Sequence, residues 1–335
     1  GRPVSPVLVE GTVTVDVRLT PDDLRAALRN DVRAGLARRP RTMPPVWFYD
    51  DRGCELYEQI TKLPEYYPFR TEQTLLRRAA GQIAEAAGAS VLVEIGSGNS
   101  EKTHELLTAM RDATGGLDGY VSFDVAEGTL RAAAEEIAAE LGIGVHAVVG
   151  DFRHHLDALP REGGPRLVAF LGSTIGNFTP VERAEFLGEV GDHLRPSDRF
   201  LLATDLVKPQ ERLVAAYDDA AGVTAAFDLN LLAVLNRELG ADFDVDRFRH
   251  VAVWNAEDSW IEMRLRALEA MTVHLPEVDM VVELEKGEEI RTEISSKFTP
   301  TQVSAELAAA GMEAMGLWSD PAGDYLLTLA RPAGR

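Results

Sequence analysis

An alternation of short apolar segments with helical patterns across residues 72–206 constrains the fold of this 335-residue chain most strongly. Each apolar segment is rich in Val, Ile, Leu or Phe and has the length of one β-strand. We expect strands at residues 90–95, 120–125, 144–150, 166–172 and 199–206. Strands that alternate with helices in this way predict βαβ units and a parallel sheet covered by helices on both faces. The sequence therefore indicates an α/β fold with a Rossmann-like, doubly wound sheet.

The alternation stops after Lys208-Pro209 and returns near residue 298. A helix and two strands follow that point, and they would complete a sheet of seven strands. We expect them at residues 300–310, 312–318 and 325–329. One domain is therefore predicted from residues 71–207 plus 298–335.

The other residues predict a second, α+β domain from residues 11–70 plus 208–297. Helical patterns occupy residues 211–243. Residues 258–298 alternate with period two, which is typical of antiparallel strands, and we expect a hairpin at Lys286-Gly287. This second domain therefore interrupts the first one along the chain.

The N-terminal part begins with residues 1–10, which we expect to be flexible. Thr20 and Pro21 have the residue types that start a helix, and Arg39-Pro40 would end it. Residues 41–70 read as an irregular segment with many Tyr, Phe and Trp residues. Such rings suit the wall of a ligand site and equally suit a lid over the core.

The net charge of -20 and the single cysteine limit the function and location of the protein. A nucleic-acid partner is not expected, because phosphate backbones are bound by clustered Lys and Arg. The negative field favours a cationic ligand instead. Cys54 has no partner for an intrachain disulfide, which fits a reducing cytoplasm. Because no apolar run could span a membrane and the chain does not start as a signal peptide does, we expect a cytoplasmic monomer without membrane contact.

A loop with two glycines, Gly96 and Gly98, follows the first strand of the alternation. These glycines let the backbone turn sharply and approach a ligand closely. A dinucleotide-binding loop would have a third glycine where this chain has Glu101, a carboxylate that would lie beside the pyrophosphate. The loop therefore favours a nucleoside cofactor without phosphate over NAD, while a plain structural turn explains the two glycines equally well.

Acidic residues stand where the predicted strands end, at Glu94, Asp124, Asp151 and Asp205. Ligands of open α/β sheets bind at this edge. Asp124 is placed to accept the hydroxyls of a ribose, or else to cap the following helix. Asp151 could accept from an adenine amino group with Phe152 beside the base, and capping is nearly as good an interpretation.

Two further places suit an amino acid substrate. Asn177 offers two donors and one acceptor for an ammonium and a carboxylate, although a plain turn would use the same residue. Strict alternation places five residues on one face of a strand: Glu289, Arg291, Glu293, Ser295 and Lys297. Glu293 and Ser295 could bind both nitrogens of an imidazole, and a solvated strand face is the simpler interpretation. We expect no metal site, because the histidines have no metal-ligand spacing.

Five motifs taken together resemble the histidine-specific SAM-dependent methyltransferases of ergothioneine biosynthesis, in their actinobacterial form. The motifs are Trp47-Phe48-Tyr49-Asp50, Leu63-Pro64-Glu65-Tyr66-Tyr67-Pro68, Glu94-Ile95-Gly96-Ser97-Gly98, Leu171-Gly172-Ser173-Thr174-Ile175-Gly176-Asn177 and Thr292-Glu293-Ile294-Ser295. The resemblance extends over nearly the whole chain from about residue 20. Asn99 and Phe178 depart from the Thr and Leu that are usual in the family.

The resemblance implies a class I methyltransferase that uses S-adenosylmethionine (SAM) as co-substrate and no metal. Three methyl groups would pass in succession to the α-amine of L-histidine and give trimethylhistidine, or hercynine. The implied SAM-binding residues are Gly96, Gly98, Lys102, Asp124, Asp151 and Phe152. The implied substrate-binding residues are Tyr66, Asn177, Tyr217, Met263, Glu293, Ile294 and Ser295. Tyr49 would assist deprotonation of the amine through a water molecule.

Other functions remain alternatives at this point. A methyltransferase that acts on another amino acid or small amine would share the SAM site and differ at Glu293. A nucleotide-dependent oxidoreductase is disfavoured by Glu101. A binding module without catalysis is disfavoured as well, because two complete ligand sites would serve no purpose in it.

Overall fold

The computed structural model describes residues 8–96, 100–161 and 163–334, which divide into two compact units. The first unit is formed by residues 1–20, 71–206 and 298–335, and the second by residues 21–70 and 207–297.

The N-terminal residues bear on two of our expectations. Residues 11–20, which we grouped with the second, α+β domain, belong to the first unit. Most of the segment expected to be flexible, residues 1–7, lies outside the described residues.

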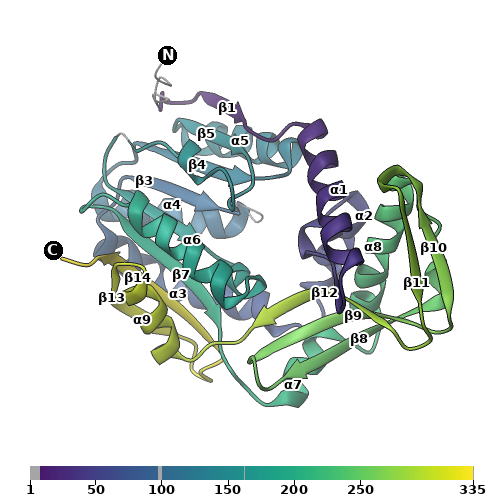
Figure 1. The fold of residues 1–335 in the computed structure, drawn as a ribbon. Helices are drawn as coiled ribbons and strands as arrows, with labels where there is room; N and C mark the ends of the chain where they lie inside the picture. Colours follow the sequence, from purple (N-terminus) through teal and green to yellow (C-terminus); the bar gives the residue numbers. More distant parts are fainter. Residues whose placement is uncertain (1–7, 97–99, 162, 335) are drawn as a thin grey trace. The chain divides into compact units, whose positions relative to one another are not determined.

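The first unit contains a sheet of eight described strands in the order β1-β5-β4-β3-β6-β7-β14-β13 (Figure 1). Their bounds are β1 (Val13–Val17), β3 (Val91–Ile95), β4 (Gly119–Asp124), β5 (Val145–Val149), β6 (Arg166–Phe170), β7 (Arg199–Asp205), β13 (Met312–Ser319) and β14 (Tyr325–Pro332). All neighbours are parallel except β14, which runs antiparallel to β7 and to β13. The predicted Rossmann-like, doubly wound sheet is confirmed. The predicted number of strands was seven, and β1 is the additional edge strand.

The central strands of this sheet are buried on both faces because both faces carry a hydrophobic core. In β3, Leu92 packs into one core together with Tyr120 of β4. Its neighbours Val91 and Val93 pack into the other core, with Phe123. The continuous apolar runs of the sequence thus serve two cores at once, as in other sheets covered by helices on both sides.

Helices and short 3-10 turns connect these strands. They are α3 (Tyr67–Ala87), α4 (Ser100–Thr114), α5 (Glu127–Leu141), η2 (Leu156–Ala158), η3 (Thr174–Asn177), α6 (Pro180–His193) and α9 (Pro300–Ala309). Helix α6 begins with a capping box, in which the Thr179 side chain accepts from the amide of Glu182 and Glu182 accepts from the amide of Thr179. A Thr followed three residues later by Glu is a usual sequence signature of a helix N-terminus.

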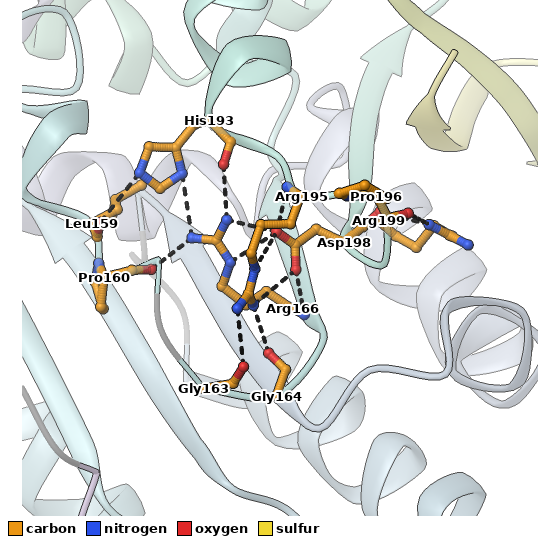
Figure 2. Close-up of polar contacts among 10 residues, drawn as sticks. All are labelled: Leu159, Pro160, Gly163, Gly164, Arg166, His193, Arg195, Pro196, Asp198 and Arg199. Carbon is orange, nitrogen blue, oxygen red and sulfur yellow. Dashed lines mark hydrogen bonds and ion pairs between the residues drawn. The ribbon is translucent and has the colours of Figure 1, made fainter. Parts of the chain in front are cut away.

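A buried arginine joins the starts of β6 and β7 (Figure 2). Ligands of such sheets are expected at the opposite ends of the strands. Arg166 is 1% exposed, and its guanidinium donates to the Asp198 carboxylate at 2.7 Å and to the carbonyls of Pro160 and His193. Arg195 donates to the same carboxylate. Burial opposes ionisation of Asp198, but the hydrogen bonds from both arginines outweigh it and lower its pKa to about 2. This network holds the starts of β6 and β7 together.

The second unit combines helices with a four-stranded sheet in the order β2-β12-β9-β8 and a separate hairpin of β10 and β11 (Figure 1). Its strands are β2 (Arg41–Thr42), β8 (Phe248–Asn255), β9 (Trp260–Ala267), β10 (Met271–Leu275), β11 (Met280–Leu284) and β12 (Glu289–Ser296). Its helices are α1 (Pro21–Ala37), η1 (Pro45–Phe48), α2 (Asp51–Ile60), α7 (Gln210–Tyr217), α8 (Val223–Leu239), η4 (Val245–Arg247) and η5 (Pro276–Val278).

Three local predictions for this unit were wrong. Residues 41–70 are not irregular, because they contain α2 and the start of α3. The turn at Lys286-Gly287 does not form a hairpin, since β11 pairs with β10 whereas β12 pairs with β9. Strand β8 also begins at Phe248, about ten residues before the antiparallel region that we expected.

A β-bulge in β12 changes which side chains share a face. Arg291 lies opposite Arg264 of β9, but the next paired residue, Glu293, lies opposite Met263, so Thr292 is an extra residue. Residues directly opposite one another in an antiparallel pair point to the same side. Glu293 therefore points to the side of Met263, away from Arg291 and Arg264.

The strict alternation in the sequence analysis was therefore wrong for part of this strand. Glu289 and Arg291 share a face with an ion-pair network around Glu262 and Arg264. Glu293 and Ser295 still point the same way, as predicted, but toward the opposite and more apolar face.

Candidate active site

The glycine loop follows β3, as predicted. Gly96 has a φ of +74°, a conformation that L side chains rarely adopt, and its position would leave open space around a Cβ atom. Glycine at this position therefore serves the backbone turn. Gly98 lies outside the described residues. A turn that begins with glycine in this conformation allows a ligand to approach the backbone closely.

Glu94 lies directly below this loop and is buried. Its Oε1 accepts hydrogen bonds from the Thr103 and Tyr120 hydroxyls, each at 2.8 Å. Burial raises the pKa of Glu94 to about 7, against the effect of these two hydrogen bonds and of Lys102. The carboxylate thereby links β3, β4 and α4 beneath the loop.

Lys102, a predicted SAM-binding residue, pairs with a buried carboxylate that the sequence analysis did not single out. The Lys102 Nζ donates to Glu72 of α3, which is 0% exposed. Glu72 also accepts from the Gly172 amide at 2.7 Å and from the Tyr325 hydroxyl. One carboxylate thus connects α3, the helix after the glycine loop, the loop after β6, and β14.

The two predicted nucleoside-binding aspartates lie at neighbouring strand ends. Asp124 is the last residue of β4, and its Oδ1 accepts from the amide of Val125 at 2.6 Å. Asp151 follows β5, and its carboxylate accepts from the Arg153 amide at 2.9 Å and contacts the His154 ring. Asp151 thus secures its own turn, and the helix-capping alternative is not observed for it, because the next described helix, η2, has His155 at its N-cap.

Phe152, the next residue, is half-buried. Its ring lies 5.5–5.9 Å from the rings of Phe170, Phe178 and Phe186. This aromatic cluster fixes the orientation of Phe152 beside the end of β5.

Asn177 is the last residue of η3 in a tight loop after β6. The loop passes through Gly172 at φ +75° and Ser173 at φ +53°, a left-handed conformation that is uncommon for serine. The Ser173 hydroxyl accepts from the amide of Asp205 at 2.9 Å, which ties the loop to the end of β7. Asn177 is thereby held on a rigid loop, half-buried.

In the second unit, the two tyrosines of residues 41–70 that were predicted to be functional each pack against other aromatic rings. The Tyr66 ring packs edge-on against Tyr217, with 6.1 Å between centroids. Tyr49 packs edge-on against Tyr57 at 5.8 Å and against Phe227 at 5.7 Å, with 43% of its surface exposed. The rings that made residues 41–70 unusual in sequence therefore meet α7 and α8.

Glu293 lies among these rings. Its charge raises the pKa of both Tyr49 and Tyr66, after the larger effects of desolvation and of Tyr57. Burial raises the pKa of Glu293 itself to about 7; Lys297 opposes this and Asp228 adds to it. Among the described residues, none donates a hydrogen bond to Glu293. A half-buried carboxylate without a donor is well placed for a ligand that brings one.

Tyr217, Ser295 and Lys297 form a hydrogen-bonded triangle next to Glu293. The Tyr217 hydroxyl lies 2.9 Å from the Ser295 hydroxyl. The Lys297 ammonium, 1% exposed, donates to both, at 2.8 Å to Tyr217 and 3.0 Å to Ser295. Met263 lies opposite Glu293 in the sheet and is buried.

Ile294 does not share this face. It lies opposite Glu262, which belongs to the ion-pair network on the other side of the sheet. The Ile294 side chain therefore points away from Glu293, and only its backbone is on hand for a ligand at that site.

Three residues behind Glu293 were missed in the sequence analysis. Asp228 of α8 accepts from the Thr292 hydroxyl and from His250 Nδ1, each at 2.6 Å, while His250 Nε2 donates to the Tyr217 carbonyl at 2.7 Å. Nε2 must donate to the carbonyl, and Nδ1 faces the Asp228 carboxylate, an arrangement that favours the doubly protonated ring. Burial opposes this state, but the hydrogen bond with Asp228 prevails and raises the pKa of His250. An acidic residue within the apolar first half of helix α8 was the available sequence signal.

Comparison with known proteins decides the family. Residues 28–332 match the family described as histidine-specific methyltransferase, SAM-dependent. The chain belongs to this family. It is 55% identical to the histidine N-alpha-methyltransferase of Mycolicibacterium smegmatis over 95% of this chain and 99% of that protein. It is 52% identical to the protein of the same name from Mycobacterium tuberculosis, again over 95% and 99%. Ergothioneine biosynthesis protein 1 of Schizosaccharomyces pombe is 27% identical over 79% of this chain and 34% of that protein.

Membership of this family confirms the resemblance that the five motifs showed. It also confirms the prediction that the protein is a SAM-dependent enzyme. The NAD-dependent alternative is not supported. No described helix is both long and apolar enough to cross a membrane.

One group of side chains in the described residues could hold a metal ion: His104 with Glu136 and Glu140. It is formed by α4 and α5, so residue spacing within one segment could not reveal it. The two glutamates are exposed, and His104 Nε2 lies 2.9 Å from Glu140. The group takes no part in the arrangement around Glu293.

Proposed function

We propose that this methyltransferase transfers three methyl groups in succession from SAM to the α-amino group of L-histidine. The product would be trimethylhistidine, hercynine, in the first step of ergothioneine biosynthesis. The observation that carries the substrate assignment is the Glu293 carboxylate, which has no donor within the described chain and shares a face with Ser295. The names of the two mycobacterial relatives support the same substrate.

The first unit has the features that a SAM site requires. Gly96 gives close access to the backbone after β3, and Asp124, one strand away, ends at the same edge of the sheet. In the proposal Asp124 accepts the ribose hydroxyls, and Asp151 with Phe152 holds the adenine. Gly98 and Lys102 complete the set by resemblance, with Lys102 acting from its pair with Glu72. The bound co-substrate supplies a methyl group already activated by a positive sulfonium.

The substrate ring is assigned to Glu293 and Ser295. An imidazole has two nitrogens on one edge of the ring, and a carboxylate and a hydroxyl two residues apart can contact both. Met263 would pack against the ring, while Ile294 would contribute only main-chain contacts. A ring without nitrogens would leave Glu293 desolvated and unpaired, which is the basis of selection.

The head group of the amino acid is assigned to Tyr66 and Asn177. Asn177 can donate to the carboxylate and accept from the amine with the two ends of one amide. The Tyr217 hydroxyl contacts Ser295 and Lys297, and we therefore assign Tyr217 to the ring end of the substrate.

A protonated amine has no lone pair, so each transfer requires loss of a proton before the nitrogen can attack. Tyr49 is neutral at physiological pH, because desolvation, Tyr57 and Glu293 all raise the pKa of its hydroxyl. It can therefore act only as a neutral hydrogen-bonding group, and we assign it the task of orienting a water molecule that takes the proton. Positioning of the amine for in-line attack supplies most of the remaining rate enhancement. In well-oriented reactions such positioning lowers the activation free energy by on the order of 7–11 kcal/mol.

Each methyl group removes one N–H donor, so the site must hold the later intermediates with fewer hydrogen bonds. The rings of Tyr49, Tyr57 and Phe227 form an aromatic wall in the second unit. Such faces attract a methylated ammonium through cation–π interaction, worth about 0.5–2 kcal/mol each. The aromatic wall would therefore retain the substrate as its polarity falls.

Mass spectrometry tests the proposal directly. The enzyme is incubated with SAM and an equimolar mixture of histidine, tryptophan, lysine and a small primary amine. We expect one, two and then three methyl additions on histidine and none on the others. Faster methylation of another compound would favour the alternative amine substrate, and no methylation at all would refute the proposal.

A further inference from the structure

Glu72 of α3 is a buried carboxylate to which the reaction proposed above gives no role. It is 0% exposed, so a ligand at the protein surface does not reach it. Its Oε1 accepts from the Lys102 ammonium, and its Oε2 accepts from the Gly172 amide at 2.7 Å and from the Tyr325 hydroxyl. Burial of a carboxylate is costly unless donors satisfy it, and these donors come from three separate segments of the chain. Any effect of Glu72 on a ligand must therefore pass through the groups that it holds.

The first group that Glu72 holds is the start of α4, the helix that follows the glycine loop. Lys102 lies in the first turn of this helix and is 7% exposed. Gln73, the next residue of α3, donates a hydrogen bond to Glu101, the neighbour of Lys102. Two adjacent side chains of α3 thus fix two adjacent side chains of α4. The direction of the Lys102 ammonium, which we assigned to SAM, therefore depends on the Glu72 carboxylate.

The second group is the stretch of main chain that leads to Asn177. Gly172 and Ser173 follow one another in the left-handed conformation, with φ values of +75° and +53°. This conformation is unfavourable for serine and persists only where the surroundings hold it. Here Glu72 accepts from the Gly172 amide, and the Ser173 hydroxyl accepts from the Asp205 amide at 2.9 Å. Asn177 ends the 3-10 turn that begins directly after Ser173, so its position follows from these two contacts.

We propose that Glu72 is a positioning residue that fixes Lys102 and Asn177 in one common arrangement and thereby aligns the methyl donor with the amino acid head group. The inference rests on the proposed function, in which Lys102 binds SAM and Asn177 binds the head group. In-line transfer requires both ligands at one fixed separation, because a misplacement of about 1 Å can lower the rate about a hundredfold. A single carboxylate that holds both binding segments meets that requirement.

This connection requires two accepting oxygens at position 72, because Lys102 contacts one of them and Gly172 the other. An amide side chain has one accepting oxygen and one NH2 group that can only donate. In Glu72→Gln the NH2 group would face either the Lys102 ammonium or the Gly172 amide, and two donors cannot bond to each other. One of the two contacts would therefore be lost, while the volume of the side chain would hardly change.

Calorimetric titration of the full-length enzyme with S-adenosylhomocysteine, and then with L-histidine while S-adenosylhomocysteine is saturating, tests this inference. We expect Glu72→Gln to weaken the binding of at least one of these two ligands about tenfold or more, although neither ligand touches Glu72. The turnover number at saturating SAM and histidine should fall about 10- to 100-fold as well, because the two bound ligands are no longer aligned. Wild-type values for both affinities and for turnover would overturn the inference.

Asp198→Asn is the matched control for a general effect on structure. Asp198 is an equally buried carboxylate of the same unit with arginine donors, but it stands at the start of β7 and not at the strand ends where ligands bind. Both variants should lower the melting temperature. At a temperature where both remain folded, Asp198→Asn should keep the wild-type affinities and turnover number. Equal losses of affinity in the two variants would overturn the inference.

Double variants show through which group Glu72 acts. If Glu72 affects histidine through Asn177, Glu72→Gln should add less than about a twofold loss of histidine affinity once Asn177→Ala is present. Lys102→Met provides the same comparison for S-adenosylhomocysteine. Losses that multiply fully in both pairs would overturn the inference, because they would show that Glu72 acts independently of both residues.

Two further outcomes remain distinguishable. If Glu72→Gln fails to fold, Glu72→Asp is the second variant, since its shorter side chain cannot reach Lys102 and Gly172 together and should cause the same losses; wild-type affinities and turnover there would overturn the inference. If the wild-type enzyme binds no histidine at all, the proposed function itself fails. Normal histidine binding by the wild type, with Glu72→Gln unchanged, refutes only the role assigned to Glu72.

Discussion

The hydroxyl of Thr292 donates a hydrogen bond to the carboxylate of Asp228 over 2.6 Å, and both residues are 0% exposed. Thr292 is the extra residue of the bulge in β12, so this contact anchors the bulge to helix α8. The same carboxylate accepts from His250. The direction in which Glu293 points is therefore set by a buried contact one residue before it.

Replacement Thr292→Val should weaken the fold and the histidine site together. Valine has nearly the same shape, but it leaves a buried oxygen of Asp228 without its donor, at a cost of about 1–3 kcal/mol in the free energy of unfolding. Urea unfolding measures this cost, and calorimetric titration should show weaker histidine binding with unchanged SAM binding. Thr328→Val is the matched control: that hydroxyl is buried in the first unit with no partner among the described residues, so its removal should cost little. Equal losses in both variants would contradict the anchoring role.

Replacement Glu293→Gln should lower histidine affinity roughly 10- to 100-fold, because a charged acceptor is replaced by a neutral amide. SAM affinity should not change. Glu289→Gln is the control on the same strand, since Glu289 pairs with Arg264 and Arg266 on the other face. Unchanged histidine kinetics in Glu293→Gln would remove the imidazole assignment.

The same variant makes a prediction for stability. The pKa of Glu293 is about 7 in the fold and 4.5 as a free group. The folded protein therefore holds this proton more tightly, so the stabilisation is complete below pH 4.5 and is lost as the pH rises through 7. Above pH 7, Glu293→Gln should be more stable than the wild type, by on the order of 1–3 kcal/mol, because it removes a desolvated charge. Denaturant midpoints measured between about pH 4.5 and 8 test the sign.

Replacement Tyr49→Phe should reduce the turnover number by about 10- to 100-fold, while SAM affinity remains as in the wild type. The ring packing against Phe227 would persist, and only the group that orients the water is lost. Tyr57→Phe removes a hydroxyl from the adjoining ring and serves as the comparison. Full turnover by Tyr49→Phe would exclude this residue from proton removal.

The buried network at the start of β6 predicts part of the acid sensitivity of the fold (Figure 2). His193 is buried beside the Arg166 cation, and both effects lower its pKa from 6.5 to about 4. The unfolded chain binds this proton more tightly, so stability is lost as the pH falls from 6.5 to 4, by on the order of 2 kcal/mol. His193→Gln should flatten this part of the pH profile in urea unfolding, whereas exposed His274→Gln should not. A profile unaltered by His193→Gln would contradict the assignment.

Much of the first unit could be predicted from the sequence because its strands are buried on both faces. The continuous apolar runs from residue 91 to residue 205 place the strands to within one or two residues. Strand β1 was missed because it is a half-buried edge strand with a short, mixed pattern. Its place in the sheet depends on pairing with Val145–Val149, which no local pattern records.

The second unit was predicted less well, for reasons that are also physical. Residues 51–60 carry a helical period, with Gly53, Leu56 and Ile60 buried on one face of α2, and the many aromatic residues of the segment drew attention away from it. The carboxylates of Glu72 and Asp228 each accept hydrogen bonds from several residues, which lie between 22 and 253 positions away in the sequence. No local sequence motif could therefore identify these two residues. Recognition of the family located Glu293 and Ser295, while alternation alone would have placed them on the wrong side of the strand.

The bulge at Thr292 means that this site depends on the number of residues in a strand as well as on their identity. If the strand paired regularly with Thr292 still in it, Glu293 would lie opposite Glu262 and would share the face of Arg264. Deleting Thr292 would instead leave Glu293 opposite Met263 on its present face and would remove only the anchor to Asp228. When relatives of this chain are compared or redesigned, the extra residue of β12 should therefore be counted as part of what sets the binding face.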